Sequence, residues 1–446
     1  MAYTMEIPRG ALFILEALNQ LGHKAYVVGG CVRDSILGRI PEDWDIATSA
    51  EPLTIKSTFI KTIDTGLKHG TITVVIDHQN FEVTTFRKDG IYSDNRRPDD
   101  VTFTTSLESD LSRRDFTVNA IAYHPHEGFI DPFFGAQDIK AKILRTVGNP
   151  TLRFQEDALR MLRAIRFSAQ LDFSIDTATL QSIKENATFI RNISQERVRM
   201  ELTKILISSH PAHFQLLHTT GLLAWVLPEF EACFTTNQNN PYHIYNVANH
   251  TLTSVSHIEN EVILRWTMLL HDIGKTLTKT TDDTGIDHFY GHPIKSVKLA
   301  EVLLKRLKFD NKSMEKICRL IKHHDVDIKL DTRLIRKAIR TLGDDIFLDI
   351  LKIKEADIRA QNPQFLTKRL VLLEKICKIY SQIKENAPCL TLSDLAVNGQ
   401  DIINIGVKEG RKVGKILNML LNACLDEPAL NTKEKLLQLC KSKGIY

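Results

Sequence analysis

A change in hydrophobic pattern near residue 150 constrains the fold of this chain more than any other feature. Before it, short β-branched or aromatic runs bounded by Gly, Asp or Asn predict strands at residues 25–28 (AYVV), 70–76 (GTITVVI) and 81–86 (FEVTTF). After it, apolar residues recur at helical spacing, as in residues 152–171, 198–207, 262–270, 294–307 and 314–323. The pattern predicts an α+β head followed by a long helical body.

Three polar or turn-rich stretches mark boundaries within the 446 residues. They are residues 147–150 (VGNP), residues 235–241 (TTNQNNP) and the charged segment 325–331. A chain of this length has room for two to four domains. We therefore predict a head at 1–145, a helical neck at 146–235, a body at 236–330 and a tail at 331–446.

The composition narrows the cellular compartment of the protein and the classes of partner that it can bind. No run approaches the roughly 20 apolar residues that a membrane-spanning helix needs, and residues 1–9 lack the pattern of a secretory signal. The seven cysteines form no CxxC pair, which argues against a disulfide framework and a thiolate zinc site. We expect a cytoplasmic protein without a membrane partner, and the net charge of +4 permits a nucleic-acid partner.

Two adjacent glycines end the first predicted strand. Gly29 and Gly30 precede a short predicted helix at residues 32–37 that Arg33 opens. Glycine lets the backbone approach a phosphate closely, and the N-terminal end of a helix favours anions. The segment therefore predicts a phosphate-binding turn.

Three carboxylates lie downstream of this turn. Asp43 and Asp45 are two residues apart in a segment with strand character, so their side chains should point to the same face. Glu82, on the strand predicted at 81–86, is the candidate for a third carboxylate. Paired carboxylate oxygens suit Mg²⁺, and a third carboxylate suits a site for two ions. An isolated DxD is usually a solvated turn, but its combination with the glycine turn and Glu82 favours catalysis.

The segment GGCVRDSILG…EDWDIAT resembles the signature of the class II CCA-adding enzyme and bacterial poly(A) polymerase family, whose head is a polymerase-β-like nucleotidyltransferase. Four later segments resemble further blocks of the family in the expected order: residues 87–103, 113–123, 131–135 and 154–167. The resemblance implies a mixed-sheet head, and template-independent addition of CCA to the 3′ end of tRNA from CTP and ATP, with Mg²⁺ and release of pyrophosphate.

By this resemblance, the EDxxR segment selects the nucleotide by its base. On a helix, Asp157 and Arg160 would share a face at i, i+3 spacing, so that the carboxylate accepts from an exocyclic amine and the guanidinium donates to ring acceptors. Glu156 is the expected partner of Arg160. Arg163 and Arg166 continue the basic stripe and are further candidates for binding the nucleotide.

Other family blocks predict contacts with the triphosphate and the sugar. Arg113, Arg114 and Asp115 are expected at the triphosphate and sugar, and Asn119 at the ribose. Residues 88–100 resemble a loop that helps to switch specificity from C to A. Residues 196–201 (ERVRME) match a block that we expect to brace the neck.

The body contains a separate set of histidines and aspartates. His250, the pair His271-Asp272 and Asp325 are candidate ligands of a transition metal, and His292 and His324 are further candidates. The segment LLHDIGK is similar to the hallmark of HD-domain phosphohydrolases. This similarity implies an HD-type body with a possible phosphohydrolase activity.

Basic residues in the tail, at 331–340 and 408–415, suit the backbone of tRNA, although solvated helical faces have the same composition. Several alternatives to full CCA addition remain open. They are a poly(A) polymerase, a partial enzyme adding only CC or only A, an HD phosphohydrolase with a vestigial head, and a non-catalytic RNA-binding protein. Residues 65–75 look more like the CCA-adding type than the polymerase.

Overall fold

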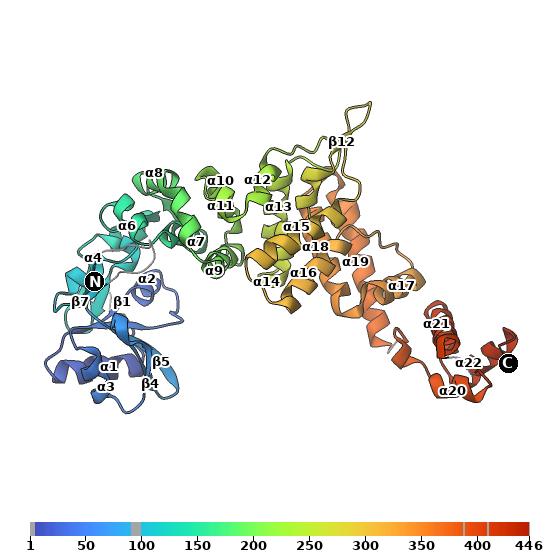
Figure 1. Ribbon diagram of the computed structural model, residues 1–446, viewed down its shortest axis with the longest axis horizontal. Helices are drawn as coiled ribbons and strands as arrows, with labels where there is room; N and C mark the ends of the chain where they lie inside the picture. The colour runs from blue at the N-terminus through green and yellow to red at the C-terminus, as the bar shows by residue number, and fades with distance from the viewer. Residues whose placement is uncertain (1–4, 91–99, 387–388, 408–409, 446) are drawn as a thin grey trace. The chain divides into compact units, whose positions relative to one another are not determined.

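A computed structural model of the chain describes residues 5–90, 100–386, 389–407 and 410–445. The chain divides into two compact units, Met1–Glu231 and Ala232–Tyr446. The first holds the large sheet and the second is built mainly of helices (Figure 1), so the predicted α+β fold is confirmed. The four-part division into head, neck, body and tail stays a prediction.

A seven-stranded mixed sheet forms the core of the head. Its strand order is β3-β4-β5-β2-β1-β8-β9, and the pair β2/β5 is parallel whereas its other pairs are antiparallel. The strands are β1 (Ala25–Val28), β2 (Asp45–Thr48), β3 (Thr62–Gly66), β4 (Thr71–Ile76), β5 (Gln79–Thr85), β8 (Ala122–His124) and β9 (Gly128–Ile130).

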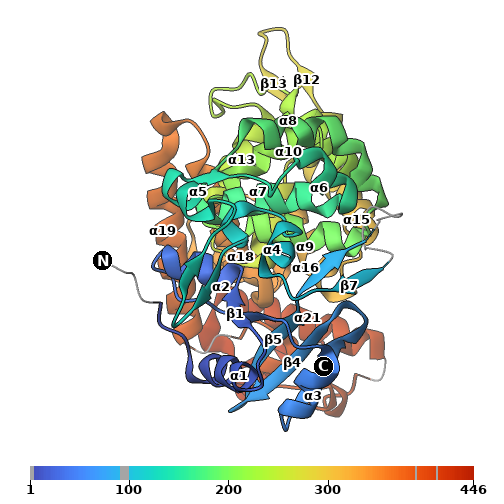
Figure 2. The ribbon, with the colours of Figure 1, turned by 90° about the vertical axis from the view of Figure 1, so that its left-hand side faces the viewer.

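Different helices pack against the two faces of the sheet. Helices α1 (Arg9–Gln20) and α3 (Pro52–Thr58) pack against the strands and against each other (Figure 2). Because side chains alternate along a strand, Tyr26 and Val28 share a face, and they pack with Leu111 of helix α4 (Leu107–Ser112). This second face carries the functional site.

Short elements connect the sheet to the neck, and helices then follow one another to the end of the first unit. The connecting elements are α2 (Gly30–Ile36), η1 (Leu67–His69), the hairpin β6 (Arg87–Asp89) and β7 (Val101–Phe103), η2 (Thr117–Asn119), α5 (Gly135–Ala141), and the pair β10 (Ile143–Leu144) and β11 (Ser174–Ile175). The helices that follow in the first unit, here called the neck, are α6 (Pro150–Glu156), α7 (Leu159–Leu171), α8 (Thr177–Asn186), η3 (Ala187–Asn192), α9 (Gln195–Leu206), η4 (Pro211–Phe214), α10 (Gln215–Thr219), α11 (Leu223–Val226) and α12 (Pro228–Glu231).

The prediction of one continuous helix at 152–171 is wrong. Helix α6 ends at Glu156 and α7 begins at Leu159. Asp157 has the extended backbone angles φ −136° and ψ 104°, which interrupt the helical hydrogen bonds. The EDxxR segment therefore spans a helix junction.

The second unit is built mainly of helices. Its elements are η5 (Ala232–Phe234), α13 (Val247–His257), α14 (Val262–Leu270), η6 (Ile273–Leu277), β12 (Thr280–Thr281), β13 (Asp287–His288), α15 (His292–Arg306), α16 (Asn311–His323), α17 (Thr332–Leu342), α18 (Asp344–Arg359), α19 (Pro363–Glu385), η7 (Leu392–Asp394), α20 (Gly399–Asn404), α21 (Gly410–Asp426), η8 (Pro428–Leu430) and α22 (Lys433–Ser442). Among the described residues, no helix is both long enough and apolar enough to span a membrane.

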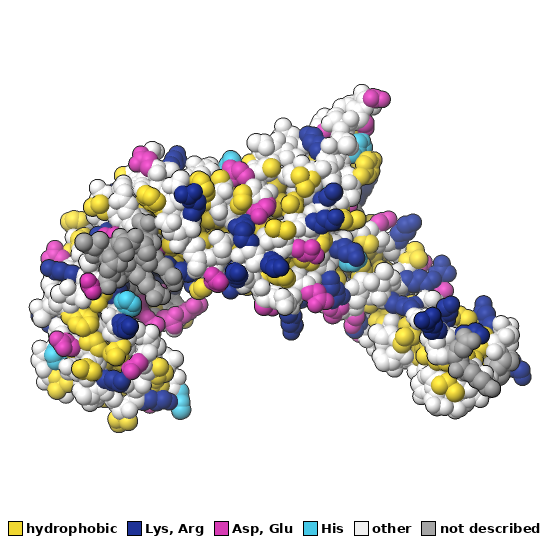
Figure 3. All heavy atoms as spheres, viewed as in Figure 1, with side chains coloured by type: hydrophobic (Ala, Val, Ile, Leu, Met, Phe, Trp, Pro, Cys, Tyr) yellow, Lys and Arg dark blue, Asp and Glu magenta, His cyan; other side chains and the backbone are white. Residues whose placement is uncertain are grey.

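The end of the second unit has a small core of its own. Residues from α20, α21 and α22, including Ile402, Leu420 and Leu436, form a separate buried cluster. On the face drawn in Figure 3, Lys and Arg side chains gather around α17 and α21. Part of this charge is used internally, because Arg336 Nε donates to the carbonyl oxygen of Leu425 at 2.7 Å near the end of α21. A cation suits this position because the carbonyl groups there carry partial negative charge.

Candidate functional site

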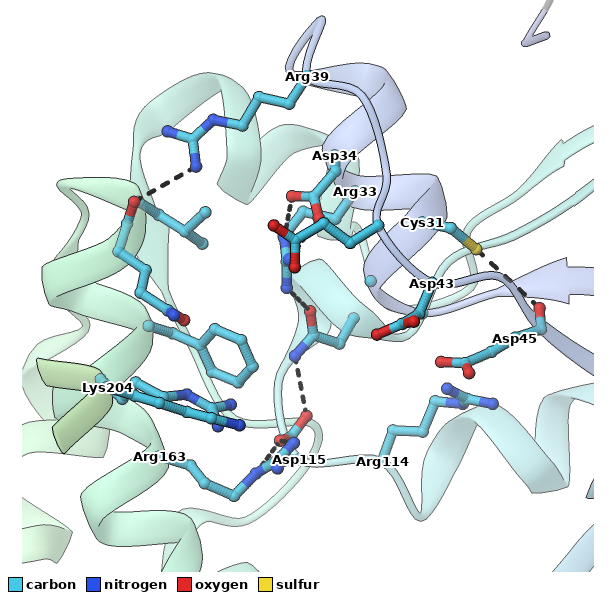
Figure 4. A pocket seen from close by; sticks show the side chains of 18 of the residues that line it. Cys31, Arg33, Asp34, Arg39, Asp43, Asp45, Arg114, Asp115, Arg163 and Lys204 are labelled. Atoms are coloured by element: carbon cyan, nitrogen blue, oxygen red, sulfur yellow. Dashed lines mark hydrogen bonds and ion pairs between the residues drawn. The ribbon is translucent and has the colours of Figure 1, made fainter. Parts of the chain in front are cut away.

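A cavity of about 1,000 Å³ lies within the first unit, at the upper end of the size range of ligand pockets. Its wall combines α2, the loop before β2, the end of α4, and helices α7 and α9 (Figure 4). Eight basic side chains face six acidic ones, so the wall favours an anionic ligand. The basic residues are Arg33, Arg39, Arg113, Arg114, Arg160, Arg163, Arg166 and Lys204, and the acidic residues are Asp34, Glu42, Asp43, Asp45, Asp115 and Asp157.

Asp43 and Asp45 line the cavity side by side (Figure 4). The prediction that both lie on one strand is wrong, because β2 begins at Asp45 and Asp43 lies in the turn before it. Burial raises the pKa of Asp45 to about 6; Arg114 opposes this rise, and the charges of Glu82 and Asp43 add to it. The negative charges of Glu82 and Asp43 thus lie close enough to Asp45 to add to the effect of its burial.

Glu82 approaches Asp45 from the neighbouring strand. The two residues are directly paired in the parallel ladder between β2 and β5, which places their side chains on the same face of the sheet. Glu82 lines a smaller cavity of about 200 Å³, which Asp45 also borders together with Arg87, Arg113 and Arg114. Asp45 therefore stands between Asp43 on one side and Glu82 on the other. An all-oxygen set with mutual repulsion fits a divalent cation.

The glycine turn brings the backbone close to these groups. Gly29 has φ +80°, which disfavours other residues, and a Cβ built there would lie 2.9 Å from Nη1 of Arg114. Gly30 is the first residue of α2. The turn thus lets the Arg114 guanidinium reach the backbone beside Asp45.

A chain of hydrogen bonds crosses the cavity from α2 to α7. Arg33 Nη1 donates to Asn119 Oδ1 at 2.6 Å, and Asn119 Nδ2 donates to Asp115 Oδ1 at 3.1 Å. Arg163 Nε then donates to Asp115 Oδ2 at 2.8 Å. Burial would raise the pKa of Asp115, but Arg163 and Asn119 outweigh it and hold the pKa well below its usual value. The buried Asp115 therefore stays ionised and fixes Asn119 and Arg163 in place.

Arg113 and Arg114 are held by one buried carboxylate. Arg113 Nη2 lies 2.7 Å from Oδ1 of Asp110, and Arg114 Nη2 lies 3.3 Å from Oδ2 of the same residue. Asp110 is fully buried at the end of α4 and was not identified from the sequence. It fixes two guanidinium groups that line both cavities.

The EDxxR residues meet at the junction of α6 and α7. Glu156 pairs with Arg160, as expected, and Arg160 Nη2 also donates to the carbonyl oxygen of Arg113 at 3.0 Å. Asp157 does not share a helical face with Arg160, and its Oδ2 accepts from Arg197 of α9 at 3.1 Å. Asp157 and Arg160 nevertheless line the same cavity.

Arg166 lines the cavity but also joins two helices of the neck. Its Nη1 donates to Glu201 Oε1 of α9 at 3.1 Å, and the guanidinium lies 4.1 Å from the centre of the Phe167 ring. Burial lowers the pKa of Arg166 to about 10. Its side chain is thus a brace between α7 and α9.

Replacing Glu201 by alanine is expected to destabilise the neck. The Arg166 and Glu201 side chains are only 7% and 6% exposed, so the change leaves a buried guanidinium without its counter-charge. Breaking such a pair costs about 3–5 kcal/mol. Denaturant unfolding of the full chain should show this loss in the transition of the first unit, whereas Glu185→Ala, at an exposed position, should stay within about 0.5 kcal/mol of wild type. A loss below about 1 kcal/mol for Glu201→Ala would contradict the argument.

The structure adds cavity residues that the sequence did not reveal. Lys204 lies on α9 and Ser208 follows that helix. Arg39 lies in the loop after α2, and Gln170 lies on α7. The segment ERVRME, which we expected only to brace the neck, supplies Arg197 to Asp157. The predicted specificity loop at 88–100 lies mostly outside the described residues, with 91–99 omitted.

The second unit gathers most of the predicted metal ligands around Asp272. One group of potential ligands comprises His250, His271, Asp272 and Asp357, and a second comprises Asp272, His292 and His324. Asp325 lies on the wall of the adjoining cavity but belongs to neither group. Burial alone would lower the pKa of His271, but Asp272 and Asp357 outweigh it and raise it to about 10. Asp357 of α18 was missed because a lone aspartate on a helix carries no local signal.

Family models match three parts of the chain. The "Poly A polymerase head domain" matches residues 25–145, and the "Probable RNA and SrmB- binding site of polymerase A" matches residues 172–234. A model of tRNA nucleotidyltransferase domain 2 matches residues 293–440. These matches cover both units.

Known proteins resemble the chain over nearly its whole length. It is 34% identical over 431 residues to a CCA-adding enzyme of Limosilactobacillus reuteri, with 95% of this chain and 94% of the relative covered. Identity reaches 52% over 217 residues with a CCA-adding enzyme of Geobacillus thermodenitrificans, covering 48% of this chain and 54% of the relative. The crystal structure of the Bacillus stearothermophilus CCA-adding enzyme in complex with CTP has a TM-score of 0.72 and 31% identity, covering 99% of both chains.

Proposed function

The chain belongs to the CCA-adding enzymes, and we propose that it adds C, C and A to the 3′ end of tRNA from CTP and ATP and releases pyrophosphate. One observation carries the proposal. The carboxylates Asp43 and Asp45 share a single cavity with clustered arginines and with Asp157 and Arg160, the candidates for selecting the base. The cavity can thus hold the reacting phosphate, the triphosphate and the base together.

The reaction joins the RNA end to the nucleotide. The 3′-hydroxyl oxygen attacks the α-phosphorus and loses its proton to solvent, and the bond from that phosphorus to the oxygen of the β-phosphate breaks, so that pyrophosphate leaves. Asp43 and Asp45, with Glu82 beside Asp45, would hold Mg²⁺. When bound, Mg²⁺ supplies Lewis-acid stabilisation of the charge that develops on the phosphoryl oxygens.

Arginines held by buried carboxylates would bind the triphosphate. Asp110 fixes Arg113 and Arg114, so the fork of each guanidinium is oriented before the nucleotide arrives. Arg33 donates to Asn119 on the wall of the same cavity, where Asn119 suits the ribose. Such preorganised positive charge favours transfer because little rearrangement is needed at the moment of reaction.

Asp157 and Arg160 would choose the base without a template. Cytosine and adenine both present an exocyclic amine, to which a carboxylate can accept, next to a ring nitrogen, to which a guanidinium can donate. Three of the five N–H groups of Arg160 are used by Glu156 and by the carbonyl oxygens of Arg153 and Arg113. The other Arg160 donors have no acceptor among the described residues, and each Asp157 oxygen, which accepts one hydrogen bond from Leu159 N–H or Arg197, could accept a second from the base.

We also infer a role for the basic residues of the second unit and a cellular compartment for the protein. Basic side chains of the second unit would track the backbone of tRNA, which is recognised by shape. Because all seven cysteines are free thiols, the protein suits the reducing cytoplasm, where its nucleotide and tRNA substrates occur.

The deciding experiment uses a tRNA transcript that lacks its last three nucleotides. With CTP alone the transcript should grow by two residues, with ATP alone it should not grow, and with both it should grow by three and stop. A tRNA that already ends in CCA is the matched control and should not be extended. Long A tails would instead support a poly(A) polymerase, and growth that stops after CC in the presence of ATP would indicate a partial enzyme.

A further inference from the structure

A smaller cavity of the first unit meets the larger one at Asp45. Its volume is about 200 Å³, and Asp45, Arg113 and Arg114 line both cavities. The rest of its wall comes from the sheet and from the hairpin β6/β7, and consists of Val28, Ile46, Thr71, Glu82, Thr84 and Arg87. Ligand pockets usually have volumes of about 300–1,000 Å³, so this cavity fits part of a nucleotide rather than a whole one.

The chemistry of nucleotide transfer gives this cavity a place in the reaction. The attacking and leaving oxygens lie roughly in line, on opposite sides of the phosphorus. Under the proposed function, the nucleoside triphosphate occupies the larger cavity, with its α-phosphate beside Asp43 and Asp45. Asp45 has Asp43 on one side, and Glu82 with the smaller cavity on the other. The RNA end is therefore expected to reach the phosphate from the side of Glu82.

Arg87 supplies a positive charge to the wall of the smaller cavity. Its Nε lies 3.1 Å from Asp89 Oδ1, and its Nη1 donates to the carbonyl oxygen of His69. Its Nη2 has no acceptor among the residues that the structure describes, so it is available to a ligand. Burial and the charge of Arg113 lower the pKa of Arg87, although Asp89 and Asp110 oppose this effect. A bound anion would offset the repulsion between the two guanidinium groups.

An aromatic ring lies beside Arg87. Arg87 and Phe103 are directly paired in the antiparallel ladder between β6 and β7, so their side chains point to the same face of the hairpin. A Cβ built on Gly70 would lie 2.8 Å from Phe103 Cε1, so the ring lies against the backbone next to Thr71 of the cavity wall. The Phe103 side chain is 37% exposed. An exposed ring beside an arginine suits single-stranded nucleic acid, because a base stacks on the ring while the cation contacts the backbone.

Two threonine hydroxyls line the same wall. Thr71 and Thr84 are paired between β4 and β5, and their Oγ1 atoms lie 3.1 Å apart. Thr84 is two residues from Glu82 on β5, so these two side chains share a face of the sheet. When one hydroxyl donates to another, the second keeps its own proton for a further hydrogen bond. The pair therefore suits the hydroxyl groups of a ribose beside Glu82.

We propose that the smaller cavity and the Phe103 ring bind the last nucleotide of the RNA acceptor strand. The base stacks on Phe103, and the backbone phosphate contacts Arg87. The ribose lies against the hydroxyls of Thr71 and Thr84. The 3′-hydroxyl then faces Asp45, on the side opposite the leaving pyrophosphate. This inference rests on the proposed function and adds a subsite for the acceptor strand to it.

The subsite suits an RNA end that changes during the reaction. Each addition makes the new nucleotide the last one, so the same position must accept bases of different identity. Stacking on an aromatic ring and contact with a phosphate depend little on which base is present. The choice of the incoming nucleotide would stay with Asp157 and Arg160 in the larger cavity.

Photo-crosslinking locates the RNA end directly. A tRNA transcript whose last base is 4-thiouridine is bound to the full chain with EDTA and without nucleotide, irradiated with near-ultraviolet light and digested with a protease. Mass spectrometry should find the crosslink in the peptide that contains Phe103, and Phe103→Leu should reduce its yield at least about fivefold. A dominant crosslink elsewhere, or no crosslink, would overturn the subsite.

Extension of tRNA lacking CCA by one C measures the contribution of each contact. Phe103→Leu keeps an apolar side chain against Gly70 but removes the ring, and it should lower kcat/KM for the RNA about 5- to 100-fold, the loss expected for one stacked base. Phe103→Tyr keeps the ring and should stay within about threefold of wild type. Arg87→Gln should lower kcat/KM for the RNA about 10- to 100-fold, as expected for a lost contact with a charged group.

Matched controls make the same changes on the opposite face of the sheet, where α1 and α3 lie. Phe13 of α1 and Lys56 of α3 are exposed, and Phe13→Leu and Lys56→Gln should each stay within about twofold of wild type. Circular dichroism shows whether each variant is folded. Because Phe103→Leu leaves the contacts of Arg87 in place, it remains informative if Arg87→Gln is unfolded. Losses in the controls equal to those at Phe103 and Arg87 would overturn the subsite.

An RNA whose last ribose lacks the 2′-hydroxyl tests the threonine contact. Wild type should extend this RNA about 3- to 10-fold less efficiently than the unmodified RNA, as expected for one lost hydrogen bond. Thr84→Val keeps the shape of the side chain without its hydroxyl and should extend the two RNAs equally, within about twofold. An equal penalty in both proteins would overturn the placement of the ribose.

The KM for CTP separates this subsite from the site of the triphosphate. It should stay within about twofold of wild type in Arg87→Gln. A higher KM for CTP with an unchanged kcat/KM for the RNA would assign Arg87 to the triphosphate and overturn the subsite. Extension by wild type with a crosslink elsewhere would retain the proposed function and reject the subsite, whereas a crosslink at Phe103 without extension would do the reverse.

Discussion

Replacing Asp45 by asparagine, together with Asp43→Asn, is expected to lower the rate of nucleotide incorporation at least about a thousandfold. Asparagine keeps the size of the side chain but removes the charge that would hold the cations. Loss of an outer partner of a metal ligand already costs about 10–100-fold, and loss of two ligands should cost more. Single-turnover extension of tRNA lacking CCA, with saturating CTP, measures the effect.

A neighbouring acid provides the matched control for this double variant. Glu42 lines the same cavity and is exposed, so Glu42→Gln should stay within about threefold of wild type. Appreciable extension by the double variant would remove Asp43 and Asp45 from the mechanism.

The single change Asp45→Asn should not lower the stability of the folded protein. Because the pKa of Asp45 is raised from 3.8 to about 6, its charge destabilises the folded state without a metal, and the penalty grows as the pH rises between these values. At pH 7 and without divalent ions, Asp45→Asn is therefore expected to unfold at the same temperature as wild type or at a higher one. A lower unfolding temperature would mean that Asp45 has a structural role.

Arg160→Lys is expected to lower CTP incorporation about 10- to 100-fold and to reduce discrimination against UTP. Lysine keeps a positive charge but lacks the fork that contacts Glu156 and the carbonyl oxygen of Arg113 and that would also donate to the base. Loss of hydrogen bonds to charged groups costs about 1.5–3 kcal/mol, which corresponds to this range. The ratio of kcat/KM for CTP to that for UTP measures the effect.

Variants of Arg197 and Arg199 test whether the contact of Arg197 with Asp157 contributes to the choice of base. Arg197→Ala removes the partner of Asp157 and should shift specificity in the same direction as Arg160→Lys, by a smaller factor. Arg199, two residues later on α9, is not the residue that donates to Asp157, and its replacement by alanine should leave the CTP to UTP ratio unchanged. An unchanged ratio in both Arg160→Lys and Arg197→Ala would exclude this junction from base selection.

The sequence was most informative where function depends on local order. The turn at Gly29 and Gly30 and the strands of the head follow from residue types at fixed spacing, and they lie where we expected them. The sequence also predicted that Glu82 lies on a strand neighbouring the Asp45 segment, and the pairing of β2 with β5 adds the register, in which Asp45 is directly opposite Glu82.

The errors arose where tertiary contacts decide local structure. Residues 152–171 have helical spacing throughout, yet Asp157 is extended and bonded to Arg197, which lies 40 residues later. Asp357 and Asp325 show the same limit. Asp325 directly follows a histidine candidate and seemed the natural ligand, whereas Asp357 is brought to His250 only by the packing of α13 against α18. Spacing along the chain cannot reveal a partner that a second helix supplies.

The rings of His271, His292 and His324 are each held by a main-chain oxygen three residues earlier. Every amino acid has that atom, so the residues at positions 268, 289 and 321 can vary in side chain without releasing the rings. An inserted or deleted residue within any of these three turns would, in contrast, rotate a ring away from Asp272. Over evolution, this part of the chain should therefore accept substitutions at the three acceptor positions more readily than changes in length.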